Sequence, residues 1–339
     1  MKKLLMPLVI LAVVMIATSM AKRGDNMLGR GDKMLGRDLQ SRPNSDQLYV
    51  EVSALGNLDY FYDHKLGMKL AGEALGVRTE YVGPAEYDIP AMITAFEQAL
   101  AKKDLKGIVV VGFEPALVPS INKAVESGVP VVTVDADLPE SKRIAFVGTG
   151  NVTAGYEGGM KLAQLIGGRG KVALMTKPGQ SNLEERIRGY KDALGKYKDI
   201  TLVQIVDTQS DAIIAAQVAT AVLRRNPDLA GIGCVEAAGG TGAATAVKEA
   251  GLAGKVKIVS MDRGNDVLEQ IGKGVISATI AQRTALMPYY AVAILYNLNN
   301  QTIPITEDNA KAKVLPVPSS VDTGVIVVDA SNYRYFLRK

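Results

Sequence analysis

The segment GIVVVGFEPALVPSINKAVESGVPVVTVD, residues 107–135, contains two apolar, β-rich runs with one helical stretch between them. We predict a buried strand at 107–112, a helix at 117–128 and a second strand at 129–135. Continuous Val and Ile runs are typical of strands that are covered on both faces, and a helix between two such strands makes them parallel. The segment therefore indicates a parallel sheet with helices on both faces.

The alternation of strand and helix continues on both sides of this segment. Further strands are predicted at 48–54, 78–82, 143–150, 171–176, 201–207, 231–236, 257–262 and 275–282, and further helices at 63–76, 91–103, 153–167, 181–194 and 285–299. Two doubly wound halves of about five strands each fit this length better than one large sheet. We therefore predict an α/β fold with two parallel-sheet halves, and ligand groups at the carboxyl ends of the strands.

The first 46 residues have a different character from the rest of the chain. Residues 1–21, MKKLLMPLVILAVVMIATSMA, begin with two lysines, continue with an apolar run and end in small residues, which is the signal-peptide pattern. Cleavage after Ala21 and retention as an N-terminal anchor both remain open. Residues 22–46 contain the tandem heptapeptides GDNMLGR and GDKMLGR and are predicted to be a flexible linker. We expect an exported protein, in the periplasm or tethered at the outer face of the cytoplasmic membrane.

Composition excludes several classes of protein. A hydrophobic content of 47% and a charged content of 22% are those of a globular protein. The net charge of +4 is spread without long runs of one sign, so we expect no nucleic-acid partner. Because the chain has only Cys234 and only His64, we expect no internal disulfide and no metal site. We also expect no cofactor, and a monomer.

The glycine-rich stretch GCVEAAGGTGAATAVKEAG, residues 233–251, resembles part of a dinucleotide-binding motif. Gly240 and Gly242 supply the first two glycines, but Thr245 stands in the third place, and the stretch lies late in the chain. We interpret the glycines as small residues that let a helix pack closely on its sheet. The sequence shows no nucleophile–base pair and no phosphate loop, so we do not expect an enzyme.

Five stretches occur in order at predicted strand ends between residues 48 and 330. They are ALGNLDYFYDHKLGMKLAGEALG (54–76), PVVTVDADLP (130–139), SNLEERIRGYKDAL (181–194), VEAAGG (235–240) and KIVSMDRGNDVLEQIGKGVISATIAQRT (257–284). With these stretches the chain resembles the type I periplasmic sugar-binding proteins of ABC importers, the group that includes ribose-binding protein. The fifth stretch is the most specific, because its residues keep both identity and spacing.

The resemblance implies two lobes joined by a three-segment hinge. It places residues 47–149 and 283–312 in the N-terminal lobe, and residues 150–282 and 320–332 in the C-terminal lobe. The hinge crossings are expected near 149–151, near 282–285 and within about 312–322.

The resemblance also implies which residues bind the ligand. Matching positions give three acceptors, two donors and an aromatic pair that covers the apolar face of a sugar: Asp135, Glu236 and Asp262; Arg186 and Gln282; and Tyr60 or Phe61. Ala136 follows Asp135 where ribose binders commonly have an arginine, which leaves ribose itself in doubt. Further candidates near these positions are Asn57, His64, Glu114 and Asn182.

The implied function is the capture of a small sugar or polyol between the lobes and its delivery to an ABC-type permease in the membrane. An alternative remains open, a ligand-sensing receptor of the same fold coupled to a chemoreceptor or a histidine kinase, which the linker and an anchor would suit. Three acidic residues around one ligand favour a neutral or cationic sugar over an anion. A repressor of this fold would need an N-terminal helix-turn-helix, and the sequence has an apolar segment there instead.

Overall fold

The computed structural model of the protein describes residues 46–57, 59–300 and 302–338. The predicted leader at 1–21 and all but the last residue of the predicted linker lie outside the described residues. Asp46–Lys339 form one compact unit with its own hydrophobic cores, so this part of the chain has what it needs to fold by itself. Among the described residues, no helix has both the length and the apolar character needed to cross a membrane.

The first sheet has six strands that all pair in parallel. Its strands are β1 (Leu48–Val52), β2 (Arg78–Val82), β3 (Leu105–Val111), β4 (Val131–Val134), β5 (Ala145–Gly148) and β11 (Ser320–Asp322). Their order across the sheet is β11-β5-β4-β3-β1-β2. The order reverses direction at β1, as in a doubly wound sheet, so helices cover both faces. We call this sheet and its helices the N-terminal lobe.

The second sheet repeats this topology with one antiparallel edge strand. Its strands are β6 (Arg169–Thr176), β7 (Asp199–Asp207), β8 (Leu229–Cys234), β9 (Lys257–Met261), β10 (Ala278–Gln282) and β12 (Val325–Asp329). Their order is β12-β10-β9-β8-β6-β7, and only the β10–β12 pair is antiparallel. We call this sheet and its helices the C-terminal lobe. The two sheets confirm the predicted α/β class.

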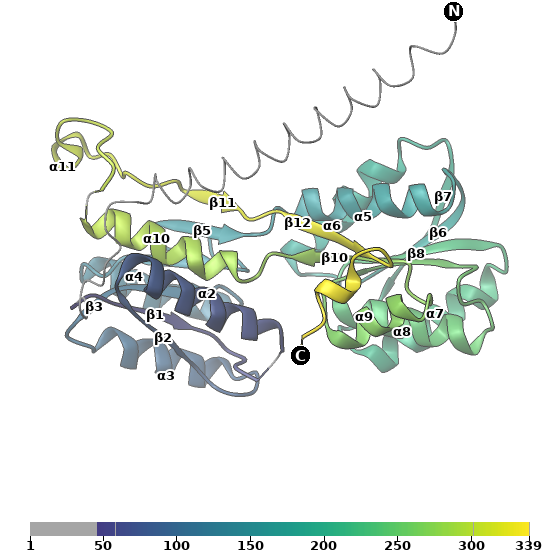
Figure 1. Ribbon diagram of the computed structural model, residues 1–339, viewed down its shortest axis with the longest axis horizontal. Helices are drawn as coiled ribbons and strands as arrows, with labels where there is room; N and C mark the ends of the chain where they lie inside the picture. Colours follow the sequence, from purple (N-terminus) through teal and green to yellow (C-terminus); the bar gives the residue numbers. More distant parts are fainter. Residues whose placement is uncertain (1–45, 58, 301, 339) are drawn as a thin grey trace, which may run out of the picture. The chain divides into compact units, whose positions relative to one another are not determined.

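The helices alternate with the strands, as predicted. The N-terminal lobe has α2 (Asp59–Leu75), α3 (Ile89–Leu100), α4 (Val118–Glu126), α10 (Leu286–Asn300) and the short α11 (Asn309–Ala312). The C-terminal lobe has α5 (Asn151–Leu165), α6 (Ser181–Leu194), α7 (Ala212–Arg225), α8 (Ala237–Glu249) and α9 (Asn265–Gly272). In the C-terminal lobe, α5 packs on α6 and α7 packs on α8, and these pairs cover opposite faces of the sheet (Figure 1).

Helix α2 begins earlier than the sequence pattern predicted. The helix was expected from residue 63, with Tyr60 and Phe61 in a preceding loop, but both aromatic residues lie in its first turn. Aspartate is common immediately before a helix, so in the sequence Asp63 resembles a helix start. In the structure the Asp63 carboxylate instead accepts a hydrogen bond from Thr284, 221 residues away, so it does not cap the helix.

The third crossing between the sheets lies later than predicted. Strand β11 pairs with β5 in the N-terminal lobe, so residues 320–322 belong there, and the prediction that placed them in the C-terminal lobe is wrong. The chain crosses at Thr323 and Gly324, before β12 begins. Thr323 binds the carbonyl of Gly148 through both its backbone N–H and its hydroxyl, at 2.8 and 3.0 Å. A three-residue strand, SVD, has too little apolar pattern to be recognised from sequence.

Three glycines of the 233–251 stretch, Gly239, Gly240 and Gly242, lie in α8 and allow it to pack closely. A methyl group on Gly240 would lie 1.8 Å from the Ser260 hydroxyl on β9. A methyl group on Gly242 would lie 2.4 Å from the Cβ atom of Ala215 on α7. These distances are too short for any side chain, which confirms the interpretation of the stretch as helix packing.

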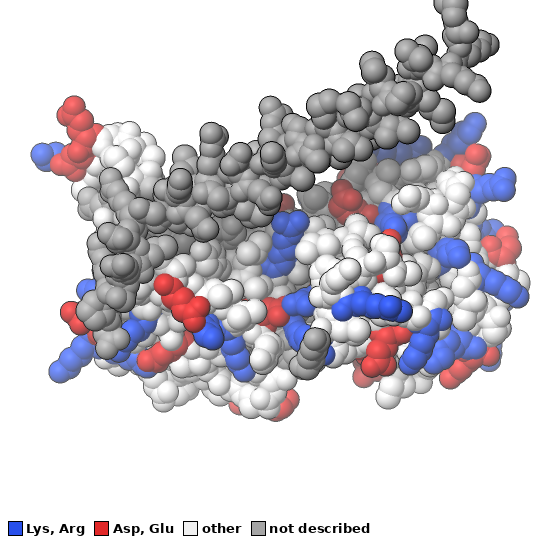
Figure 2. Space-filling view, viewed as in Figure 1, with Lys and Arg blue, Asp and Glu red and all other residues white. Residues whose placement is uncertain are grey.

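The second sheet separates two hydrophobic clusters, while the N-terminal lobe has one cluster around its own sheet. Charged side chains lie mainly outside these cores. Figure 2 shows acidic and basic side chains side by side on one face of the molecule. Exposed ion pairs of the described residues include Lys142–Glu126 and Lys273–Glu269. Exposed pairs of this type add little to the free energy of unfolding.

Candidate functional site

Asp135 and Asp262 occupy equivalent positions in the two lobes, directly after β4 and β9. Their φ angles are 64° and 66°, in the left-handed region that non-glycine residues adopt at a cost of about 1 kcal/mol or more. The Asp135 backbone N–H donates to the Val147 carbonyl at 3.1 Å, and that of Asp262 donates to the Ile280 carbonyl at 2.9 Å. Each lobe therefore presents one strand-end carboxylate, held by the same backbone arrangement. Strain of this kind is concentrated at functional sites.

Gln282, at the end of β10, connects Asp262 to the hinge. Its Nε2 donates to Asp262 Oδ1 at 2.8 Å, and its Oε1 accepts from Thr149 Oγ1 at 2.8 Å and from Arg186 at 3.3 Å. Burial raises the pKa of Asp262, although Arg186 and the bond from Gln282 oppose the shift. The predicted residues Asp262, Gln282 and Arg186 therefore form one hydrogen-bonded group.

Arg186, on α6, is 5% exposed and is fixed from several sides. In addition to its bond to Gln282, its Nε donates to Asn151 Oδ1 at 2.9 Å and its NH1 donates to the Val235 carbonyl at 3.0 Å. A guanidinium has five N–H groups, so two are left for a ligand among the described contacts. This arrangement holds the fork of donors rigidly beside Asp262.

Of the two predicted aromatic residues, Tyr60 is the one beside the aspartates. Its hydroxyl donates to Asp135 Oδ1 at 2.6 Å. Burial raises the pKa of Tyr60 well above its usual range, and the charges of Asp135 and Asp262 add to the shift. Phe61 is only 1% exposed, belongs to the hydrophobic core and meets Phe113 edge-to-face at 6.0 Å. The Phe61 ring also meets the Tyr60 ring edge-to-face at 5.1 Å and has no exposed face.

His64 is not a surface residue, because it forms a fully buried pair with Glu51 of β1. Its Nδ1 lies 2.5 Å from Glu51 Oε1, and both side chains have zero exposed area. The imidazole lies 5.8 Å from the Tyr60 ring and 5.0 Å from the Phe61 ring. Burial alone would lower the pKa of His64, but the negative charges of Glu51, Asp135 and Asp63 outweigh it, so the pKa is raised.

We expect His64 to remain protonated above its ordinary pKa of 6.5, which an NMR titration of this single histidine can measure. A folded-state pKa above the unfolded value means that the pair contributes stability in full below pH 6.5 and loses it as the pH rises through the folded-state pKa. In the variant Glu51→Gln the imidazole should titrate at a lower pH than in the native protein. A neutral imidazole in the native protein at pH 6.5 would contradict this assignment.

Glu236 was predicted to be the last residue of a strand at 231–236, but in the structure it is the N-cap residue of α8. Its two carboxylate oxygens accept from the backbone N–H groups of Ala238 and Gly239 at 2.8 and 2.9 Å, and Oε1 also accepts from Thr208 Oγ1 at 2.8 Å. Burial raises its pKa, while these bonds oppose the shift. Glu236 therefore fixes the start of α8, and its role as a ligand acceptor stays a prediction.

The remaining candidates, in loops or at a helix start, do not form part of the buried group. Asn57 is exposed and donates to Glu86 at 3.2 Å. Glu114 accepts from the Tyr87 hydroxyl at 2.9 Å, and Asn182 is half-buried in the first turn of α6. Their participation in binding also stays a prediction.

A family model described as periplasmic binding protein domain matches residues 50–302, most of the part of the chain described above. The chain belongs to the periplasmic binding protein domain family. This confirms the resemblance drawn from the five stretches, and with it the fold class.

Several relatives in this family bind sugars according to their names. The chain is 32% identical over 247 residues to the D-allose-binding periplasmic protein of Escherichia coli, covering 70% of this chain and 79% of that protein. AraP, an arabinose binding protein from Geobacillus stearothermophilus, superposes with a TM-score of 0.82 at 36% identity, covering 87% of this chain and all of AraP. A sugar-binding protein of a sugar ABC transporter from Bacillus halodurans gives a TM-score of 0.81 at 36% identity, covering 86% of this chain and all of that one.

The relatives are binding proteins of sugar importers, not enzymes, in agreement with the prediction from sequence. Within the described residues no group of three or more His, Cys, Asp or Glu side chains is placed to hold a metal ion.

Sequence analysis missed two polar residues of the site. Thr149 and Asn151 follow β5, and they bind Gln282 and Arg186 respectively. The expectation that ligand groups lie at the carboxyl ends of strands could have found both, because polar residues after a parallel strand lie at the same edge as those after its neighbours.

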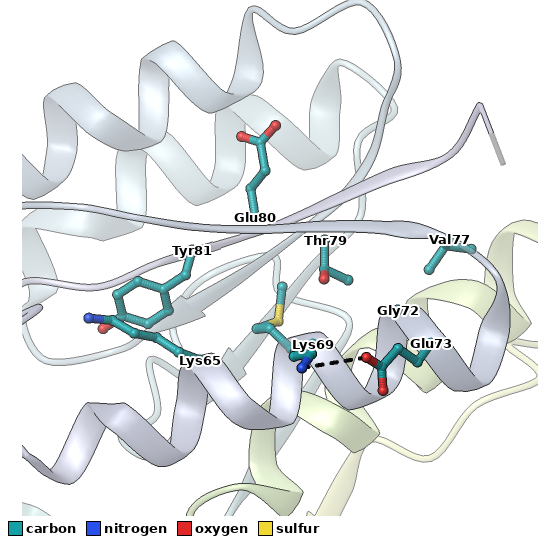
Figure 3. A pocket seen from close by; sticks show the side chains of 9 residues that line it. Lys65, Lys69, Gly72, Glu73, Val77, Thr79, Glu80 and Tyr81 are labelled. Atoms are coloured by element: carbon teal, nitrogen blue, oxygen red, sulfur yellow. Dashed lines mark ion pairs between the residues drawn. The ribbon is translucent and has the colours of Figure 1, made fainter. Parts of the chain in front are cut away.

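A separate pocket of about 350 Å³ lies on the outside of the N-terminal lobe (Figure 3). It lies between α2 and β2, and Lys65, Lys69, Glu73 and Tyr81 are among its lining residues. Lys65 lies 5.2 Å from the centre of the Tyr81 ring, and Lys69 pairs with Glu73 at 3.7 Å. None of the predicted ligand residues lines this pocket.

Proposed function

We propose that this protein captures a small neutral sugar or polyol between its two lobes and delivers it to an ABC-type permease. The observation that carries the proposal is the pair of strand-end aspartates, one in each lobe, held in the same strained conformation beside Tyr60 and Arg186. Carboxylates accept strongly from hydroxyl groups, and an aromatic ring suits the apolar face of a sugar. Bonds to both lobes favour the closed state, because only that state satisfies all of them.

The charges around the site favour a neutral ligand over an anion. Asp135, Glu236 and Asp262 are acidic, and the one arginine among the predicted residues, Arg186, already binds protein oxygens. A sugar phosphate would place further negative charge beside three acidic residues that have a single arginine among them. Burial raises the pKa of Glu236 and of Asp262, so further negative charge beside them would be unfavourable.

The importer role is favoured over a sensory role because curated relatives carry import in their names, among them ribose and D-apiose import binding proteins. The proposed location is outside the cytoplasm, as the signal-peptide pattern of residues 1–21 predicts.

A thermal-shift screen of Asp46–Lys339 tests the proposal. We expect D-allose, D-ribose or arabinose at about a hundred times its Kd to stabilise the protein by about 2.7 kcal/mol, which corresponds to a rise of about 4 °C in Tm. Sugar phosphates should give no shift. Stabilisation by amino acids but by no neutral sugar or polyol would overturn the sugar assignment.

A further inference from the structure

Asp63 on α2 is a nearly buried carboxylate whose partners come from the other lobe and from the hinge. Its side chain is 6% exposed. Its Oδ2 accepts from Arg263, from Arg338 at 3.0 Å and from Thr284 Oγ1 at 2.7 Å. Burial alone would raise the pKa of Asp63, but the bond from Thr284 and the two arginines lower it. The carboxylate is therefore charged at neutral pH.

Both arginines are anchored in the C-terminal lobe. Arg263 directly follows Asp262, and its NH1 donates to the Phe336 carbonyl at 3.4 Å. The backbone N–H of Arg338 donates to Asn265 Oδ1 at 3.1 Å, and Asn265 Nδ2 donates to the Arg338 carbonyl at 3.3 Å. The C-terminal tail is thus attached to α9, and the two guanidinium groups extend from the C-terminal lobe to one carboxylate of the N-terminal lobe.

We propose that Asp63, Arg263 and Arg338 form a latch between the lobes, which holds the closed state and positions Asp262 for the ligand. Asp63 and Arg263 are positioning residues in this assignment, because they act through Asp262 and do not touch the ligand. The effect on ligand release rests on the proposed function, whereas the effect on the lobes needs no ligand.

The position of Arg263 explains how the latch acts on the site. Asp262 is held at a positive φ, and its backbone N–H is bound to Ile280. A displacement of Arg263, the next residue, would therefore change the direction of the Asp262 carboxylate. Separation of the lobes would break the contacts of Asp63 with two cationic partners and expose the carboxylate to water, so these ionic contacts favour the closed state.

The test compares the native Asp46–Lys339 protein with the variant Asp63→Asn by small-angle X-ray scattering without ligand. We expect the variant to have a larger radius of gyration, because the closed state loses its ionic contacts. The matched control is Asp329→Asn, which removes a half-buried carboxylate from an ion pair inside the C-terminal lobe, with Lys161 at 2.9 Å. This control should keep the native radius. Equal radii for the native protein and Asp63→Asn would overturn the latch.

Arg263 provides a second route that does not alter a buried residue of α2. Arg263→Gln should expand the protein as Asp63→Asn does, and Arg263→Lys should recover part of the native radius because it keeps the charge. The double variant Asp63→Asn/Arg263→Gln should expand no further than Asp63→Asn alone, since Asp63→Asn already removes the ionic contact with Arg263. Additive expansion would indicate two unrelated structural effects and would overturn the pairing.

Ligand kinetics separate the latch from the proposed function. With D-allose or D-ribose as the probe, we expect Asp63→Asn to release sugar at least about tenfold faster, with the association rate nearly unchanged. An expanded variant with a native release rate would overturn the role in ligand retention. If neither these nor other neutral sugars bind, the proposed function fails, while the scattering comparison still decides whether the latch exists.

Discussion

Replacement of His64 by phenylalanine should lower the free energy of unfolding by about 3–5 kcal/mol at pH 7.5. His64 and Glu51 are both fully buried, and Nδ1 of one lies 2.5 Å from Oε1 of the other. Phenylalanine fills most of the volume but leaves the carboxylate without a counter-charge. The carboxyl group must then stay charged in the core or take up a proton, which for an ordinary glutamate at this pH costs on the order of 4 kcal/mol.

The opposite single variant should be less damaging. In Glu51→Met the imidazole loses its partner, but an ordinary histidine is mostly neutral at pH 7.5, so it can release its proton at little cost. We therefore expect Glu51→Met to lower the free energy of unfolding by less than His64→Phe does. The double variant Glu51→Met/His64→Phe should recover most of the native stability, because apolar residues often replace a buried ion pair without loss.

Urea unfolding of the four proteins at pH 7.5 measures this cycle. An exposed pair on the same helix supplies the control: Lys69 and Glu73 are 3.7 Å apart and more than half exposed, so Lys69→Met should change stability by less than about 0.5 kcal/mol. A loss below about 1 kcal/mol for His64→Phe would show that Glu51 finds another partner or water in the variant. A double variant as unstable as His64→Phe alone would assign the loss to packing and not to charge.

The repeating elements of the fold could be predicted from sequence because each one is a local pattern. The strand at Arg78–Val82 and the helix at Ser181–Leu194 were predicted with their observed bounds. The last strand of each sheet, β11 and β12, was not recognised. Both come from the C-terminal segment, and each pairs with a strand far away in the chain, such as β11 with β5. Pairing of this kind leaves no periodicity in a short segment.

The candidate site shows the same division between local and long-range information. Asp135, Asp262 and Gln282 were predicted from the resemblance to periplasmic sugar-binding proteins, which rests on local stretches of sequence at strand ends. The buried pair of His64 with Glu51 and the contacts of Asp63 with Arg263 were missed. Asp63 and Arg263 are 200 residues apart, and no spacing rule connects them. Only the packing of α2 beside the hinge brings the two arginines to this carboxylate.

The variant Asp262→Asn should bind sugar at least about tenfold more weakly than the native protein, while its stability stays equal or rises. An amide keeps the shape of the side chain but accepts less strongly than a carboxylate, and hydrogen bonds to charged groups are worth about 1.5–3 kcal/mol. Asparagine also tolerates a positive φ, so the backbone at 66° can be kept. The amide oxygen can still accept the bond from Gln282 Nε2, so the hydrogen-bonded group remains connected.

The direction of the stability change follows from the pKa of Asp262. Burial raises this pKa above the ordinary value of 3.8, so the folded protein binds the proton more tightly than the unfolded chain does. The stability that this group contributes is therefore highest at low pH and is lost as the pH rises from 3.8 through the folded-state pKa. At neutral pH the ionised carboxylate opposes folding, and an uncharged asparagine removes that penalty. A charged residue that lowers the stability of the fold in this way is typical of a binding site.

Asp329→Asn is the matched control, because the same substitution should have the opposite effect there. Hydrogen bonds from Ser331 and Lys161 lower the pKa of Asp329 to about 2, so its carboxylate stabilises the fold at neutral pH. We expect Asp329→Asn to lower Tm and to leave sugar affinity unchanged, and Asp262→Asn to maintain or raise Tm and to lose affinity. The measurements are thermal unfolding and calorimetric titration with the sugar that gives the largest shift in the screen. If Asp262→Asn keeps native affinity, Asp262 is not a ligand acceptor, and the pairing of one carboxylate from each lobe on the ligand cannot be correct.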